Sequence, residues 1–249
     1  MLSPNQIEEI QAQAFCGVAS ELEGVCKIKP MTIKEIMEFG NLKYQSVIGT
    51  LLLTEVEIAE MIKKKTGKEP NIEKIYPLDY LLQSASFNDT FLLELQSYFS
   101  TFIKEDILLL PKINSILIGA PQERRLITND NFSDFQDIIR IQNGKKIKEP
   151  PPENESEIAR KFRLKREARD AAKKKQQEKN GEGQSLGELF EIAETFGIDY
   201  QNKTLYAFYK LIRRFQAREK WNQDLQMLCA GADSTKLKTK YWGESLDEK

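Results

Sequence analysis

The sequence predicts an α+β protein that is predominantly α-helical, and three observations lead to this fold class. Apolar residues recur at helical spacing along much of the chain, as in the stripe between residues 91 and 102. Short strand-like runs succeed one another in only one region, residues 107–128. With 40% hydrophobic and 30% charged residues, the 249-residue chain can form a packed core beneath a large solvated surface. We therefore expect a small hairpin or sheet set against helices.

The first elements follow from local signals at their ends. Residues 1–27 open with a polar helical stretch, and the apolar segment Phe15–Val25 is ambiguous. Thr32 and Glu35 form a Thr-x-x-Glu capping box, in which each side chain satisfies a backbone N–H of the first helical turn. Gly40 supplies the left-handed residue that ends such a helix.

Three further helices are predicted before the strands. One covers Leu42–Lys64, or part of it, and stops near Gly67. Another begins at Pro77, because the first helical turn tolerates proline. The third runs from Asp89 to about Lys104, and its apolar stripe favours packing into the core over a groove for a partner.

The strand region consists of Ile107–Leu110, Ser115–Ile118 and, as a third run, Arg125–Thr128. All three runs are rich in β-compatible residues and are separated by turn residues. Asn131 is then expected to cap a helix that ends near Gly144.

The composition changes at Lys145, where a basic, proline-containing segment begins. Pro150–Pro152 cannot continue a helix and favours an extended spacer. Residues 157–179 hold ten lysines and arginines against four acids, with almost no apolar stripe. We therefore predict three units: a mostly helical domain over residues 1–148, a charged linker helix over 149–184 and a small helical domain over 185–249.

The C-terminal unit begins with a second capping box, formed by Ser185 and Glu188, and Gly197 is expected to end its first helix. Thr204 is expected to start a long helix that carries Leu205, Phe208, Ile212 and Phe215 at helical spacing. About 65 residues form a marginal domain alone, so we expect this unit to dock on the first domain or on a partner.

The composition argues against catalysis and against bound metals or cofactors. Histidine, the commonest general base and metal ligand, is absent. The three cysteines, Cys16, Cys26 and Cys229, have no CxxC spacing, and we interpret all three as small buried hydrophobic residues. No glycine-rich phosphate loop is present. A two-carboxylate hydrolase stays formally open, but no acidic pair stands out among 38 acids, so the expectation is a non-enzymatic protein.

Neither a signal peptide nor a membrane span is visible. The N-terminus lacks a basic segment followed by an apolar run, and no stretch approaches the ~20 apolar residues of a spanning helix. The expected location is the cytoplasm.

The basic segment 157–179 has two interpretations. It could neutralise phosphates of a nucleic acid, but Phe162 is its only aromatic residue, so base stacking is not expected. A solvated spacer helix is favoured, because acids within the segment soften its field. Between the two lies the hypothesis that Arg163, Lys165 and Arg166 bind an acidic surface of a protein partner.

Several blocks in the second half resemble a protein family of tailed phages and prophages of Firmicutes. They are NFSDFQDIIRIQNG at 131–144, KFRLKREARD at 161–170, the stretch 205–220, LCAGAD at 228–233 and KYW at 240–242. This order of blocks spans about half of the chain, whereas residues 1–120 are much less diagnostic.

The resemblance implies a tail assembly chaperone, which occupies the position between the tail tube protein and the tape measure protein. Such a protein would coat the tape measure protein in the bacterial host cytoplasm and recruit tail tube subunits, in repeated copies along its partner. The family often joins an N-terminal domain to a C-terminal extension, and the change at Lys145 matches this layout. A structural tail or connector subunit of the virion, and a nucleic-acid-binding accessory protein, are the alternatives.

Four aromatic residues are candidate anchors for such a partner: Tyr206, Tyr209, Trp221 and Trp242. Aromatic side chains dominate the energetics of protein interfaces. For Tyr206 and Tyr209, closing the small C-terminal core is an equal alternative. Trp242 lies near a chain end with few neighbours, which favours a contact role.

Overall fold

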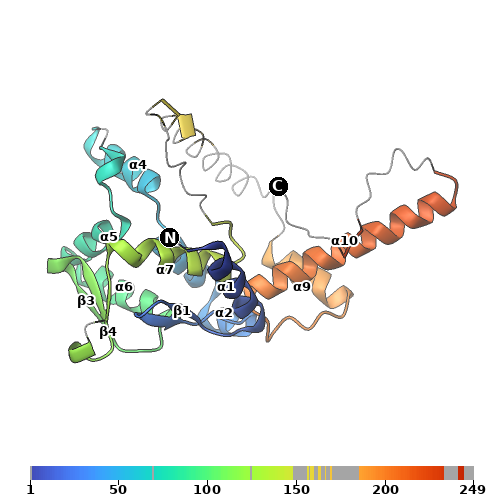
Figure 1. Ribbon diagram of the computed structural model, residues 1–249, viewed down its shortest axis with the longest axis horizontal. Helices are drawn as coiled ribbons and strands as arrows, with labels where there is room; N and C mark the ends of the chain where they lie inside the picture. Colours follow the sequence, from blue (N-terminus) through green and yellow to red (C-terminus); the bar gives the residue numbers. More distant parts are fainter. Residues whose placement is uncertain are drawn as a thin grey trace.

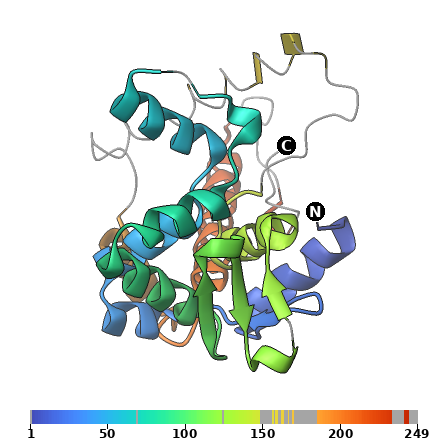
Figure 2. The same ribbon diagram turned by 90° about the vertical axis from the view of Figure 1, so that its left-hand side faces the viewer.

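The computed structural model describes residues 2–68, 70–123, 125–147, 185–232 and 241–243, together with seven positions between 156 and 169. It confirms the predicted class, because most of the described elements are helices and two small antiparallel sheets lie against them (Figures 1 and 2). The helices are α1 (Pro4–Cys16), α2 (Ile33–Phe39), α3 (Asn41–Leu51), α4 (Glu55–Thr66), α5 (Pro77–Ser86), α6 (Asp89–Phe102), α7 (Asn129–Gln142), α9 (Leu186–Thr195) and α10 (Leu205–Cys229). The strands are β1 (Ser20–Leu22), β2 (Cys26–Ile28), β3 (Ile107–Leu110), β4 (Ser115–Ile118) and β5 (Arg125–Ile127). Single turns of 3-10 helix cover Ile72–Lys74, Pro111–Ile113 and Pro121–Glu123.

The predicted strand region forms a three-stranded sheet in the order β3-β4-β5, which faces the viewer in Figure 2. Ile116 lies opposite Leu109 on one side and Ile127 on the other, and all three are buried. Leu108 points to the opposite face and keeps 52% of its surface exposed. The alternation of a half-buried antiparallel sheet therefore holds on β3, although leucine occupies both faces.

A second hairpin, β1–β2, begins in the segment Phe15–Val25 that the sequence left ambiguous and ends just after it. Each strand has three residues with a buried-exposed-buried pattern, and Gly24 turns between them with φ 67°. Three residues are too few for their alternation to be distinguished from helical spacing. The hairpin joins the core because the Lys29 N–H donates to the Phe102 carbonyl at 2.9 Å.

The predicted helix over residues 42–64 is two helices, α3 and α4, separated at Leu52–Thr54. Thr54 caps α4, because its hydroxyl accepts from the Glu57 N–H and Glu57 reaches back to the Thr54 N–H. This Thr-x-x-Glu box has the same pattern as Thr32–Glu35, which is confirmed at the start of α2. Gly67 ends α4 in the left-handed conformation, as predicted.

The expectation that Asn131 caps the next helix was wrong, because Thr128 is the cap of α7. The Thr128 hydroxyl accepts from the Asp130 N–H. Asn131 is the third helical residue, and its side chain accepts from the Thr128 N–H while donating to the Leu126 carbonyl. Asparagine thus takes the place of the glutamate in a capping box and ties α7 to β5.

Helix α7 is the centre of the fold, since every residue from Phe135 to Asn143 is buried. Its polar side chains satisfy backbone groups of other segments. Gln136 donates to the Leu51 and Leu53 carbonyls at 2.9 and 3.0 Å, and Gln142 donates to the Ile28 carbonyl at 2.9 Å. These bonds fix the ends of α3 and β2, because buried carbonyls need partners.

The C-terminal helices pack on the N-terminal ones and share their hydrophobic cluster. Both predicted starts are confirmed, with Ser185 and Glu188 capping α9 and Thr204 capping α10. The Thr204 hydroxyl also donates to the Ala14 carbonyl of α1 at 2.6 Å, and Thr204 forms a β-bridge with Thr32. The division into units at residues 148 and 184 stays a prediction, and Pro150–Pro152 lie outside the described residues.

The expectation of three buried cysteines was wrong for two of them. Cys26 is buried in the hairpin, whereas Cys16 and Cys229 are exposed at the last residues of α1 and α10. A helix end beside solvent does not bury a small side chain unless another element covers it. None of the helices in the described ranges is long and apolar enough to cross a membrane.

Candidate functional site

Helix α10 has two different halves. Its first half is anchored, because Leu205, Phe208 and Ile212 are buried. After Phe215, which stacks on Phe196 at 4.1 Å between ring centroids, Asp224 is the only buried residue of the helix. Figure 1 shows the second half extending away from the rest of the protein.

Two of the predicted anchors, Tyr206 and Tyr209, lie in the packed half. Tyr206 is only 8% exposed, so its side chain offers little surface to a partner. Tyr209 is half-buried, and its ring lies against Gly144 at the end of α7, where an added Cβ would come within 2.9 Å. Burial raises the pKa of Tyr209 above its usual value. Packing is therefore the main observed role of both residues.

The other two predicted anchors, Trp221 and Trp242, are brought together through Tyr241. The Trp221 and Tyr241 rings meet edge to face at 5.7 Å, and Tyr241 lies 5.7 Å from Trp242. Arg214 holds this turn by donating to the Trp242 carbonyl at 2.6 Å. Both tryptophans are half-buried, so part of each residue remains accessible.

The second half of α10 also exposes apolar and basic groups. Leu225 and Met227 keep 40% and 44% of their surface exposed. Lys220 is exposed as well, whereas Asp224 is buried and Glu219 pairs with Arg218 at 3.7 Å.

The predicted basic site is described only in part. Arg166 is exposed and Arg163 is half-buried, while Lys165 lies outside the described residues. Both arginines have interactions within the chain. The predicted binding of an acidic partner by these three residues stays a prediction.

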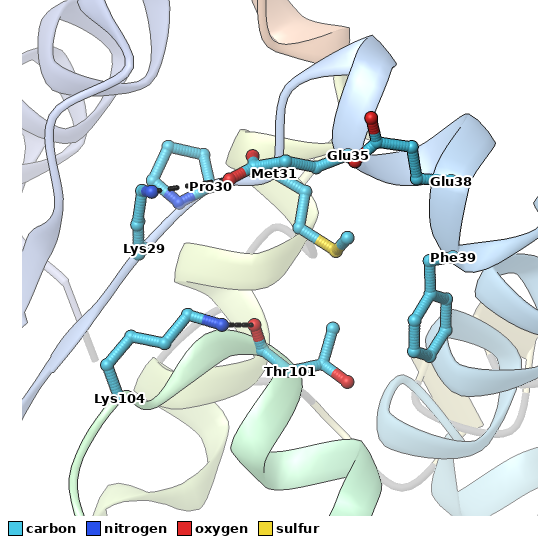
Figure 3. A pocket seen from close by; sticks show the side chains of 8 residues that line it. All are labelled: Lys29, Pro30, Met31, Glu35, Glu38, Phe39, Thr101 and Lys104. Atoms are coloured by element: carbon cyan, nitrogen blue, oxygen red, sulfur yellow. Dashed lines mark hydrogen bonds and ion pairs between the residues drawn. The ribbon is translucent and has the colours of Figure 1, made fainter.

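A pocket of about 350 Å³ opens at a place that the sequence did not indicate (Figure 3). It lies where the segment after β2, helix α2 and the C-terminal end of α6 meet. Its lining residues are Lys29, Pro30, Met31, Glu35, Glu38, Phe39, Thr101 and Lys104. Only the Thr32–Glu35 box was visible beforehand, because the pocket depends on contacts between segments about 70 residues apart.

The pocket has an apolar floor and a charged rim. Met31 and Phe39 pack against the core with part of their surface free. On the rim, Lys29 pairs with Glu35 at 3.4 Å. Burial tends to raise the pKa of Glu35, but hydrogen bonds from the Thr32 N–H and hydroxyl, together with Lys29, hold it below its usual value. Glu35 is therefore held as a carboxylate at neutral pH.

Across the part of the chain that the structure describes, no three cysteine or acidic side chains gather into a group that could hold a metal ion. No family model, curated protein or solved structure matches the chain.

Proposed function

We propose that this chain is a non-catalytic tail assembly chaperone that binds the tape measure protein and helps to recruit tail tube subunits. One observation carries the proposal: the second half of α10 extends from the body and keeps Leu225, Met227 and part of Trp221 accessible. A helix that exposes apolar residues beside half-buried aromatic ones suits the binding of another amphipathic helix. The resemblance described above identifies that helix as part of a tape measure protein around which the tail tube has not yet assembled.

The test is co-expression of the tagged chain with the tape measure and tail tube proteins of the same phage, followed by a pull-down. Capture of the tape measure protein is expected, together with absence of the chain from purified virions by mass spectrometry. No capture, combined with several copies per virion, would identify a structural tail component instead.

A double variant, Leu225→Asp with Met227→Asp, locates the contact. We expect it to weaken capture by about tenfold or more, because it places two charges in a surface that the partner would desolvate. Leu42→Asp is the matched control, since Leu42 is 87% exposed on α3 and lies on another helix. Equal loss in the control would mean that the charge acts non-specifically.

A further inference from the structure

The second half of α10 extends away from the body (Figure 1), yet one stripe along it is covered. Residues at 3-4-3-4 spacing are buried or half-buried there, and this spacing puts their side chains on one face of a helix. Apart from Glu219, every other residue from 216 to 229 is exposed. The covered stripe consists of Arg214, Ala217, Trp221, Asp224 and Leu228. A helix surrounded by solvent would show no such periodic burial, so another part of the chain lies over this face.

Residues near the end of the chain lie on this stripe. Tyr241 meets the Trp221 ring edge to face at 5.7 Å between ring centroids. One residue later, the Trp242 carbonyl accepts a hydrogen bond from Arg214 at 2.6 Å. Since Arg214 precedes Trp221 in α10, residues 241 and 242 run antiparallel to the helix, back towards the body. We call residues 241–243 the C-terminal strap.

The C-terminal strap overlaps the proposed partner-binding surface. Leu225 follows Trp221 by four residues, so the two side chains are neighbours on the helix. Leu225 is exposed, whereas Trp221 is half-buried. A partner helix laid over Leu225 would therefore need the space beside Trp221 that Tyr241 occupies.

We infer that the C-terminal strap is an autoinhibitory contact, which covers part of the partner-binding face of α10 and has to be displaced before a partner helix binds there. The inference rests on the proposed function, because it describes how access to the same surface is regulated. A protein whose binding-competent state is only partly populated binds with an affinity reduced by that fraction. Loss of the strap contact should therefore strengthen binding.

The contacts of the strap suit a part that can be released. Tyr241 keeps 50% of its surface exposed. None of Trp221, Tyr241 and Trp242 belongs to the hydrophobic cluster that the N-terminal and C-terminal helices share. An edge-to-face aromatic pair shifts an equilibrium by about twofold to tenfold, which a partner helix that buries a larger apolar area can overcome. Release of the strap therefore leaves the core intact.

The experiment co-expresses the full-length chain, as wild type and as variant under two different tags, with the tape measure protein of the same phage. The two forms compete for the tape measure protein, and quantitative mass spectrometry of the captured complex gives their ratio. Tyr241→Ala is expected to be captured about twofold to tenfold more than wild type. Tyr241→Phe should equal wild type, because phenylalanine keeps the ring edge that meets Trp221. Tyr76→Ala is the matched control and should also equal wild type, since Tyr76 is 52% exposed and precedes α5.

A second measurement needs no partner. Trp242→Phe leaves Trp221 as the only tryptophan and keeps the backbone carbonyl that Arg214 contacts. In this background, Tyr241→Ala should shift the Trp221 emission to the red and increase its quenching by acrylamide, because the ring loses its cover. Tyr241→Phe should change neither, and far-UV circular dichroism should be the same for all variants.

The outcomes separate this inference from the proposed function. If neither wild type nor Tyr241→Ala captures the tape measure protein, both are overturned. If wild type captures it and Tyr241→Ala captures no more, only the inference is overturned, and weaker capture would mean that the strap is part of the binding surface. Stronger capture without a change in Trp221 quenching, or an equal gain in Tyr76→Ala, would also contradict the inference.

Discussion

At the scale of single residues, the three cysteines differ in reactivity. Burial, and then the nearby Glu105 carboxylate, raise the pKa of the Cys26 thiol to about 12 against a smaller opposing effect of Arg125. Cys16 and Cys229 are exposed. Because the thiolate is the reactive form, a thiol reagent at pH 8 should modify two cysteines rapidly and the third only on unfolding. Mass spectrometry of labelled peptides gives the measurement, and rapid modification of Cys26 would contradict the structure.

Replacing Gln136 tests how much a buried side chain that donates to backbone carbonyls contributes to stability. Gln136→Ala removes donors to the Leu51 and Leu53 carbonyls, between α3 and α4. We expect the free energy of unfolding to fall by about 1–3 kcal/mol, because these carbonyls lose their partner. Urea denaturation measures the change. Gln83→Ala is the control, since Gln83 is exposed on α5 and the same change there should cost less than about 0.5 kcal/mol.

At the scale of elements, the register of the sheet can be tested with neighbouring leucines. Leu109 is 7% exposed on the core face of β3, and Leu108 is 52% exposed on the other face. Leu109→Ala should destabilise the protein by about 2–5 kcal/mol, as truncations in a core do. Leu108→Ala should cost much less. Equal losses in thermal or urea unfolding would mean that the outward face of the sheet is covered.

The contact between α7 and α10 depends on a glycine. Gly144 has φ 65°, and a Cβ there would lie 2.9 Å from the Tyr209 ring. Gly197 has φ 63° with no atom within 4 Å of such a Cβ. Replacing either glycine with alanine should lower the free energy of unfolding by about 1 kcal/mol, because alanine disfavours a positive φ. Gly144→Ala should lower it by a further ~1–3 kcal/mol, because the added Cβ overpacks against Tyr209. In the Tyr209→Ala background, the two glycine variants should have nearly equal free energies of unfolding.

The elements show what the sequence could and could not predict. Caps and prolines identified the starts of α2, α5, α9 and α10, because these signals act within four residues. The hairpin β1–β2 was missed since its three-residue strands are held by the distant Phe102 and Ile103. The pocket was missed for the same reason, as its rim joins charges that only the tertiary fold brings together. Tyr206 could not be assigned from spacing alone, because a helical stripe does not indicate which partner covers it.

At the scale of the whole molecule, Thr204 connects the beginning and the end of the chain. Thr204→Val removes the cap of α10 and the bond to Ala14, whereas Thr204→Ser keeps a hydroxyl. We expect the free energy of unfolding to fall by about 1–2 kcal/mol in the valine variant and by clearly less in the serine variant. Both tryptophans lie near the C-terminus, so their fluorescence reports on that part, while far-UV circular dichroism reports on all helices. If the whole chain shares one core, the unfolding midpoints from fluorescence and from circular dichroism should shift together in the valine variant. A shift of the fluorescence midpoint alone would indicate separately unfolding units.

The bond between Thr204 and Ala14 joins residues 190 positions apart, which has a consequence for synthesis of the protein. Ribosomes add roughly 5–20 residues per second, so α1 is made roughly 10–40 s before Thr204, the residue to which it bonds. During that interval α1 can already pack on α7 and β1, but the side of α1 that contacts α10 stays uncovered. Completion of the native core therefore waits for the synthesis of α10, and a ribosome that stops before residue 204 releases a chain in which this side of α1 is uncovered.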